Sequence, residues 1–330
     1  MLQVKNNATK RTNTTKRGYP AEKRFRKLLK RHFAYWLGLL VTTVLREIPL
    51  SFCSWALSRI FLIWYVFFVK YRRRTQKHLR MVFGKTRDDK WYKHTTRTMF
   101  MNLGRNLAEF LHIPRMPRSR FLELVDGSDY VKKISAATSK GRGAICVTGH
   151  IGNWELLAAY SAKFFPTAVI AKKIYFEKFD REVVKRRKAL GVEVIYQEDG
   201  LMPVMRALRS NRVIGILADQ DISDIAGVFV DFLGMEAYTP IGPASMAIAS
   251  DAPLFVVCME RISEGRHRIL ISDQVPWTPS GSRKSDRFNL TENWNRLLCG
   301  FIKKHPEQWV WFHRRWKTTR DKIRARNGKI

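Results

Sequence analysis

Short apolar runs alternate with helical segments between residues 144 and 271, and this alternation constrains the fold more than any other feature of the 330-residue chain. Each run has the length of a buried strand, and the runs lie at residues 144–147, 168–171, 192–196, 213–218, 254–259 and 268–271. Helices are predicted at about residues 154–164, 177–190, 202–210, 240–250 and 286–304. The pattern predicts an α/β sheet covered by helices, where ligands gather at the carboxyl ends of the strands.

The stretch RGAICVTGHIGNWELLAAY, residues 142–160, places two proton-handling groups at one strand-to-helix junction. His150 follows the first apolar run, and Glu155 stands five residues later, after a turn at Gly152 and Asn153. A neutral His serves as a general base when a carboxylate orients its ring and stabilises the imidazolium. Alternatively, His150 only ends the strand, and Glu155 begins a helix, where the helix dipole favours acids. Spacing alone leaves both interpretations open.

Two later stretches carry clustered polar side chains. The apolar run at 213–218 ends in Asp219, Gln220 and Asp221, which either line a cleft or form a loop of solvated acids. Near the C-terminus, Arg314 and Arg315 are interleaved with Trp and Phe. Guanidinium groups bind phosphate while indoles favour a lipid boundary, so this mixture suits a phosphate-bearing amphiphile. The alternative is an ordinary basic helix end.

The chain is strongly basic, with 61 Lys and Arg against 28 Asp and Glu, a formal net charge of +33. Such a surface attracts nucleic acid, an anionic membrane or an acidic protein, and ten Trp and twenty Phe favour a membrane interface. The four cysteines are far apart in sequence, which predicts reduced core thiols and no zinc site; they are Cys53, Cys146, Cys258 and Cys299.

Residues 32–75 are predicted to contact a membrane. Residues 1–31 are interpreted as a disordered basic arm, and the apolar segment 48–69 is long enough to span a bilayer. Arg59 near its middle costs roughly 2.5–3.5 kcal/mol at a membrane centre, so a shallowly inserted helix is preferred. A full span and a buried core helix are the alternatives. Residues 91–134 are expected to be helical, with a break at prolines 114 and 117.

The ordered motifs VTGHIGNWE, VIAKKIYFEKFDREVVKRRKALGVEVI, ILADQD with GVFVDFLG, TPIGPA and PEQWVWFHRRWK resemble the bacterial lipid A late acyltransferases, within the lysophospholipid acyltransferase superfamily. The resemblance runs from roughly Pro49 to Lys317. It implies a glycerolipid acyltransferase-like α/β fold, with a central mixed sheet covered by helices and an N-terminal membrane-associated helix. It also implies transfer of a fatty acyl group from acyl carrier protein to a hydroxyl of a glycolipid, without a metal or cofactor.

The resemblance assigns roles to residues. The family's His-x4-Asp/Glu motif falls on His150 as general base and Glu155 as its partner. The family's Arg falls on Arg187, where a guanidinium would stabilise the oxyanion formed on a thioester; the alternative is a solvated basic helix face. Substrate-binding roles fall on the cleft and phosphate or carrier residues Asn153, Asp219, Gln220, Asp221, Arg314 and Arg315. No Ser or Cys is expected beside His150 as a covalent nucleophile, so direct transfer in a ternary complex is predicted.

The predicted organisation is a basic arm (1–31), a membrane-associated segment (32–75), an α/β acyltransferase domain (76–317) and a basic tail (318–330). The expected partners are acidic acyl carrier protein, an anionic membrane surface and a phosphorylated glycolipid acceptor, with no role for nucleic acid, and acyl-CoA is the alternative donor. The expected location is the cytoplasmic face of the inner membrane. The alternatives are another acceptor, such as a lysophospholipid or a mannosylated phosphoinositide, or a catalytically inactive basic binding protein.

Overall fold

The computed structural model describes residues 21–327, so residues 1–20 of the predicted arm and 328–330 of the predicted tail lie outside the described residues. The chain divides into two compact units between Val44 and Leu45. Helix α1 (Ala21–Glu47) includes residues 21–31 of the predicted arm. The predicted membrane-associated segment 32–75 is therefore divided between the two units, and everything described below belongs to the second.

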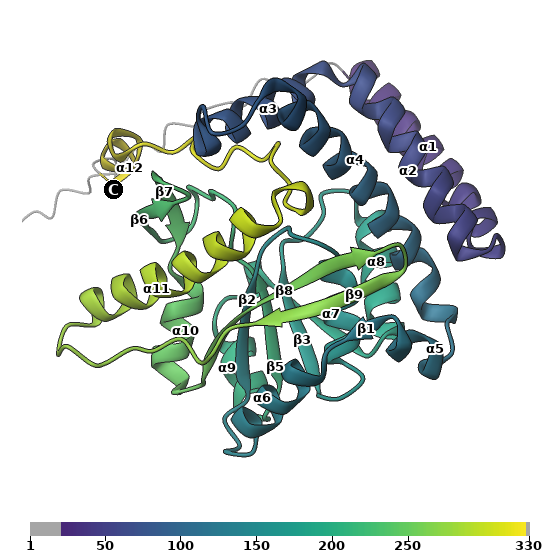
Figure 1. Ribbon diagram of the computed structural model, residues 1–330. Helices are drawn as coiled ribbons and strands as arrows, with labels where there is room; N and C mark the ends of the chain where they lie inside the picture. The colour runs from purple at the N-terminus through teal and green to yellow at the C-terminus, as the bar shows by residue number, and fades with distance from the viewer. Residues whose placement is uncertain (1–20, 328–330) are drawn as a thin grey trace, which may run out of the picture. The chain divides into compact units, whose positions relative to one another are not determined.

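The described chain forms a seven-stranded mixed sheet in the order β1-β9-β8-β2-β5-β3-β4 (Figure 1). Neighbouring strands are parallel except β8 and β9, which pair antiparallel. The prediction of an α/β fold with a mixed sheet is confirmed. The strands are β1 (Val125–Asp126), β2 (Ala144–Thr148), β3 (Thr167–Ala171), β4 (Val192–Tyr196), β5 (Val213–Leu217), β8 (Leu254–Ser263) and β9 (Arg266–Ile271).

The predicted helices between the strands form within a few residues of their expected ends. The prediction that residues 91–134 are helical is only partly correct. Pro114 and Pro117 separate a long helix from shorter ones, and the short strand β1 interrupts the helices at residues 125–126. The helices are α2 (Leu50–Phe67), α3 (Val69–Phe83), α4 (Asp89–His112), α5 (Arg118–Glu123), α6 (Ser128–Thr138), α7 (Trp154–Ser161), α8 (Glu177–Ala189), α9 (Met202–Arg209), α10 (Gly242–Ser250), α11 (Arg283–Lys304) and α12 (Arg320–Asn327).

Side-chain alternation along β2 separates two hydrophobic cores. Ile145 and Val147 point to one face of the sheet, where residues of α4, α9, α10 and α11 pack. Ala144 and Cys146 point to the opposite face and pack against α6 and α7. Because side chains alternate between the two faces and helices cover both faces, every residue of β2 is buried. All four cysteines are buried and free of disulfides, as predicted.

A two-stranded antiparallel hairpin, β6 (Gly227–Phe232) and β7 (Met235–Pro240), was not predicted. Its residues follow the polar cluster after β5, where the sequence pattern predicts no strand. The turn residues Leu233 and Gly234 both have positive φ, 59° and 91°. Leu is rare at positive φ, so this turn carries no Asn-Gly signal for a hairpin.

Helix α2 is buried along one side only. Its small residues lie against α4, where a Cβ on Gly104 would stand 2.4 Å from the Leu57 carbonyl oxygen, so the two backbones pack closely. The other side exposes large apolar residues, including Trp64 and Phe67, the latter 76% exposed. Only 22% of this 18-residue apolar stretch is buried. A core helix would be mostly buried, so the core-helix alternative does not fit, and the helix is long and apolar enough to cross a membrane.

Candidate active site

Two strands that are distant in sequence bring the predicted base together with a carboxylate. β2 and β5 are neighbouring parallel strands, and Thr148, the last residue of β2, lies opposite Leu217, the last residue of β5. His150 and Asp219, each two residues beyond a strand end, therefore meet at the carboxyl edge of the sheet. His150 Nδ1 lies 2.8 Å from Asp219 Oδ1, and the His150 backbone N–H donates to Asp219 Oδ2 over 2.8 Å.

The Asp219 carboxylate fixes the tautomer of His150. Asp219 is completely buried, and the Trp309 indole Nε1 also donates to its Oδ2, over 2.7 Å. Burial opposes the negative charge, but the adjacent His150 and His313 outweigh it and hold the pKa of Asp219 well below its usual range. An ionised carboxylate only accepts hydrogen bonds, so His150 Nδ1 carries the hydrogen. The lone pair of a neutral His150 is therefore on Nε2, as a general base requires.

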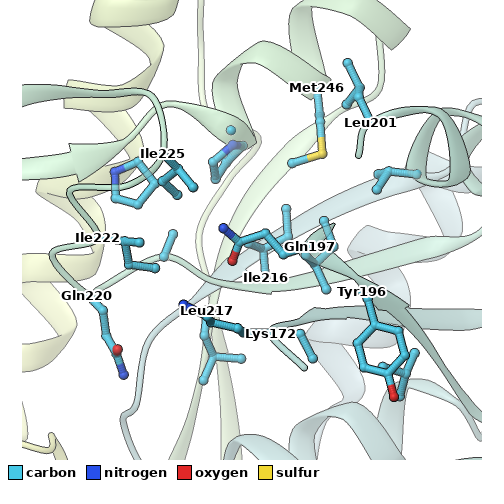
Figure 2. Close-up of a pocket in the computed structure, with 18 of the residues that line it drawn as sticks. Lys172, Tyr196, Gln197, Leu201, Ile216, Leu217, Gln220, Ile222, Ile225 and Met246 are labelled. Carbon is cyan, nitrogen blue, oxygen red and sulfur yellow. The ribbon is translucent and has the colours of Figure 1, made fainter. Parts of the chain in front are cut away.

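His150 lies in the wall of a cavity of about 810 Å³ at the carboxyl edge of β2, β5, β3 and β4. Gln220 and Arg187 contribute polar groups to the same cavity. A space of this volume with mostly apolar walls suits a long apolar chain rather than a small polar ligand. Figure 2 shows the apolar wall residues Leu201, Ile216, Leu217, Ile222, Ile225 and Met246.

Glu155 does not orient His150, and this prediction needs correction. Glu155 forms a bidentate ion pair with Arg187, with 3.0 Å from Oε2 to Nε and 2.6 Å from Oε1 to Nη2. Among the hydrogen bonds of the described residues, none joins His150 to Glu155. The reason is geometric: Glu155 is in the first turn of α7 and meets α8, whereas Asp219 is already beside the imidazole. Two predicted site residues, Glu155 and Arg187, are thus brought together as a separate pair.

A buried polar cluster supports the turn that follows His150. The Asn106 amide donates to the Gly152 carbonyl over 2.6 Å, and the Arg261 guanidinium donates to Asn106 and to Glu109. Asn153 caps α7 by accepting from the Leu156 N–H and donates to Glu109 over 2.7 Å. Asn153 is 1% exposed, so the structure does not place it as a substrate-binding residue. Its position explains instead why the turn is rigid.

The C-terminal segment closes the site from another side. The Val310 N–H donates to the His150 carbonyl over 3.0 Å, and the Gly152 N–H donates to the Gln308 carbonyl over 2.9 Å. This pairing brings in His313, a residue that the sequence analysis missed. Its ring centroid lies 4.9 Å from that of His150. Burial, together with the neighbouring His150 and Arg74 side chains, lowers the pKa of His313 to about 4.

Residues 21–318 match the family described as bacterial lipid A biosynthesis acyltransferase. The chain belongs to this family. The matched residues include β2 and β5, the turns after them that carry His150 and Asp219, and the C-terminal segment that carries His313.

The names of individual relatives indicate two kinds of acceptor, a phosphatidylinositol mannoside and lipid A. A phosphatidylinositol mannoside acyltransferase of Mycolicibacterium smegmatis is 31% identical over 49% of this chain and 54% of its own length. A lipid A biosynthesis palmitoleoyltransferase of Escherichia coli is 23% identical over 87% of this chain and 92% of its own length. A lipid A biosynthesis lauroyltransferase of Escherichia coli is 30% identical over 38% of this chain and 40% of its own length. The chain thus spans about half the length of the mycobacterial relative that it matches.

The two arginines of the C-terminal basic motif, Arg314 and Arg315, have different surroundings. Arg315 is fully buried, donates to the Tyr238 carbonyl over 2.7 Å and lies 4.1 Å from the centroid of the Phe232 ring. Burial lowers the pKa of Arg315 to about 10. The predicted phosphate-binding role of Arg315 is therefore corrected: it holds the β6–β7 hairpin. Arg314 is exposed, so its predicted role stays open.

Asp221 is also a scaffolding residue rather than a cleft residue. It is 5% exposed, and its carboxylate accepts from the Thr318 backbone N–H over 2.8 Å and from the Thr318 hydroxyl over 2.6 Å. Asp219 and Gln220 are the members of the polar motif that reach His150. Because β5 ends at Leu217 and the chain then turns, neighbouring residues of this motif have different surroundings.

Proposed function

We propose that the protein is an O-acyltransferase that moves a fatty acyl group from acyl carrier protein to a hydroxyl of a lipid A precursor or related glycolipid. One observation carries the proposal: the His150 imidazole, oriented by a buried carboxylate, lies in the wall of an apolar cavity large enough for a fatty chain. Such a base suits deprotonation of a hydroxyl beside an apolar substrate. Membership of the acyltransferase family supports the same reaction class.

In the proposed reaction, acceptor and donor react directly in a ternary complex. His150 Nε2 takes the proton of the acceptor hydroxyl as its oxygen bonds to the thioester carbon, and the carbon–sulfur bond then breaks as the thiolate takes that proton. A covalent acyl-enzyme on Cys146 is disfavoured, since this thiol is buried in the core against α6 and α7 and burial raises its pKa to about 12. The mechanism uses no cofactor; acyl-CoA is the alternative donor.

The proposed acceptor is a phosphorylated glycolipid. The lipid A acyltransferase of Escherichia coli aligns with nearly the whole chain, which supports a lipid A precursor. A phosphatidylinositol mannoside is the second candidate, because that relative has the higher identity over a shorter segment. Acyl carrier protein and both acceptors are acidic, and a chain with net charge +33 suits them and an anionic membrane without involving nucleic acid.

The assay that tests the function uses the purified full-length protein, radiolabelled acyl carrier protein thioester and three acceptors in detergent: a lipid A precursor, a phosphatidylinositol mannoside and a lysophospholipid. We expect a new acylated glycolipid, identified by mass spectrometry, and no product with His150→Ala because the base is lost. Normal transfer by His150→Ala would contradict the mechanism. Salt-sensitive nucleic-acid binding without acyl transfer would instead favour a binding protein.

The enzyme is further proposed to reside at the cytoplasmic face of the inner membrane, with the exposed side of α2 in the lipid. Replacing Ile63, Trp64 and Phe67 together with Ser should weaken binding to anionic vesicles at least ~100-fold, since each buried apolar side chain contributes roughly 1.5–3 kcal/mol. The measurement is vesicle co-sedimentation. Phe164→Ser with Ile262→Ser, which alters exposed apolar residues elsewhere, should bind like the parent. Unchanged binding of the triple variant would exclude α2 as the contact.

Alkaline carbonate washing separates the two membrane geometries. A shallowly inserted α2 should be released from membranes by the wash, as expected for a helix that lies in the interface. Retention in the washed membranes would support a full span, with Arg59 shielded by its contact with the Trp55 ring, 5.9 Å from the centroid.

A further inference from the structure

Acyl transfer from a thioester creates negative charge on the carbonyl oxygen, and a hydrogen-bond donor beside the base must stabilise it. Arg187, the donor expected from sequence, already gives two nitrogens to Glu155. The position next to His150 is occupied by a different donor, the side-chain amide of Gln220, which also lines the cavity.

The Gln220 amide lies beside the base without blocking it. Its nitrogen is 3.2 Å from His150 Nε2 and 3.4 Å from His150 Nδ1. A group in line with the Nε2 lone pair would be much farther from Nδ1, because that lone pair points away from the rest of the ring. The amide nitrogen therefore does not occupy the lone pair, which stays open to an acceptor hydroxyl. It lies close enough to donate a hydrogen bond to the carbonyl oxygen of a thioester that reacts beside His150 Nε2.

His313 holds this amide from the other side. Gln220 Nε2 is 3.3 Å from His313 Nε2, and the partly buried His313 stays neutral at pH values well above 4. In the tautomer that carries its hydrogen on Nδ1, neutral His313 accepts one amide N–H at Nε2. The groups that face His313 and carry or acquire charge are His150, Asp219 and Arg74. Within residues 21–327, the polar contacts of the Gln220 amide nitrogen are with the two histidine rings alone. Because the nitrogen does not lie on the His150 lone pair, only the N–H directed at His313 is used, which leaves the second N–H for a substrate.

We propose that Gln220 donates a hydrogen bond to the oxyanion of the acyl-transfer reaction and that His313 is its positioning residue. The inference rests on the proposed acyltransferase function. When the acceptor oxygen bonds to the thioester carbon and its proton moves to His150 Nε2, the carbonyl electron pair moves onto oxygen, where the second Gln220 N–H binds it. When the carbon–sulfur bond breaks, the pair returns and the thiolate takes the proton from His150.

The test is a double-mutant cycle in the acyl transfer assay, with kcat and KM measured separately. Gln220→Met keeps the side-chain length and removes the donor, so kcat should fall about 10²- to 10³-fold with KM nearly unchanged. His313→Phe should lower kcat about 10-fold in the parent and have no further effect in the Gln220→Met background. His313→Gln, which restores an acceptor for the amide, should recover most of the loss.

Gln274→Met, at an exposed position, is the matched control and should retain the parent's kcat. Multiplying losses in the double variant would show that His313 acts independently of Gln220 and would overturn its positioning role. A Gln220→Met enzyme with the parent's kcat would overturn the oxyanion role. If the parent protein itself forms no acylated product with any of the three acceptors, the proposed function fails, which separates that failure from failure of this inference. Equal melting temperatures for all variants confirm that folding is not the cause.

Discussion

Replacing Asp219 with Asn should lower kcat about 10³- to 10⁴-fold with little change in KM, in an enzyme that remains folded. The carboxylate accepts hydrogen bonds from His150 Nδ1, from the His150 backbone N–H and from the Trp309 indole. An amide has only one acceptor oxygen, so its NH₂ group must face at least one of these donors. If the NH₂ group faces Nδ1, the imidazole switches tautomer and Nε2 loses the lone pair that takes the proton. Steady-state acyl transfer and circular dichroism measure the two expectations.

Glu155→Gln is the informative comparison for Asp219→Asn. It removes the ion pair with Arg187 but leaves the tautomer of His150 unchanged, so its loss of kcat should be smaller than that of Asp219→Asn. Asp273→Asn, at a carboxylate whose side chain is 96% exposed, should retain the parent's kcat. A greater loss with Glu155→Gln than with Asp219→Asn would restore the sequence-based assignment of Glu155 as the partner of the base.

Asp219 and His313 also destabilise the folded protein in acid. The folded pKa of Asp219 is depressed, so its contribution is present above the unfolded pKa of about 3.9 and is lost as pH falls through the folded value. His313 resists protonation until about pH 4 when folded but takes a proton near pH 6.5 when unfolded. The unfolded state therefore binds more protons between those values, and stability falls as pH falls from about 6.5 to 4.

The sequence predicted the sheet well because the strands are local apolar runs bounded by turn residues. It also placed His150 at a strand end, which requires only the strand and the Gly that follows. The predicted partner of His150, Glu155, was wrong because the contact of His150 with Asp219 depends on β2 and β5 being neighbours in the sheet. β3 and β4 lie between these two strands in the sequence. Strand order is a property of the whole chain. The spacing from His150 to Glu155 reports only on local sequence, whereas the contact of His150 with Asp219 is long-range.

Burial explains the other differences at the site. Arg314 and Arg315 are adjacent in a basic aromatic motif, yet one is exposed and the other fully buried. Periodicity gives no such distinction in a short irregular segment. His313 in the same motif was overlooked because the arginines offered a simple phosphate interpretation. The available signal was a histidine directly after Phe312 in this aromatic segment. The pairing of the segment with the turn after β2 is seen only in the structure.

Gly152→Ala should destabilise the protein by more than about 4 kcal/mol or prevent its folding, because the turn after His150 has no room for a side chain. Gly152 has φ of +59°, and a Cβ at this position would lie 1.5 Å from the Met259 carbonyl oxygen in β8. Backbone atoms cannot rotate away as a flexible side chain can, so β8 or the turn must move. Movement of the turn would break the hydrogen bonds of Gly152 to Asn106 and Gln308.

Gly141→Ala isolates the conformational part of this cost. Gly141 has φ of +72°, but no heavy atom would lie within 4 Å of the added methyl group, so its replacement should cost only about 1 kcal/mol. The measurement is the denaturant midpoint and the melting temperature of both variants. Equal small shifts would mean that β8 yields easily and that the turn is not the rigid support of His150. A large loss confined to Gly152→Ala would show that contact with β8 fixes the turn, and with it the position of the base.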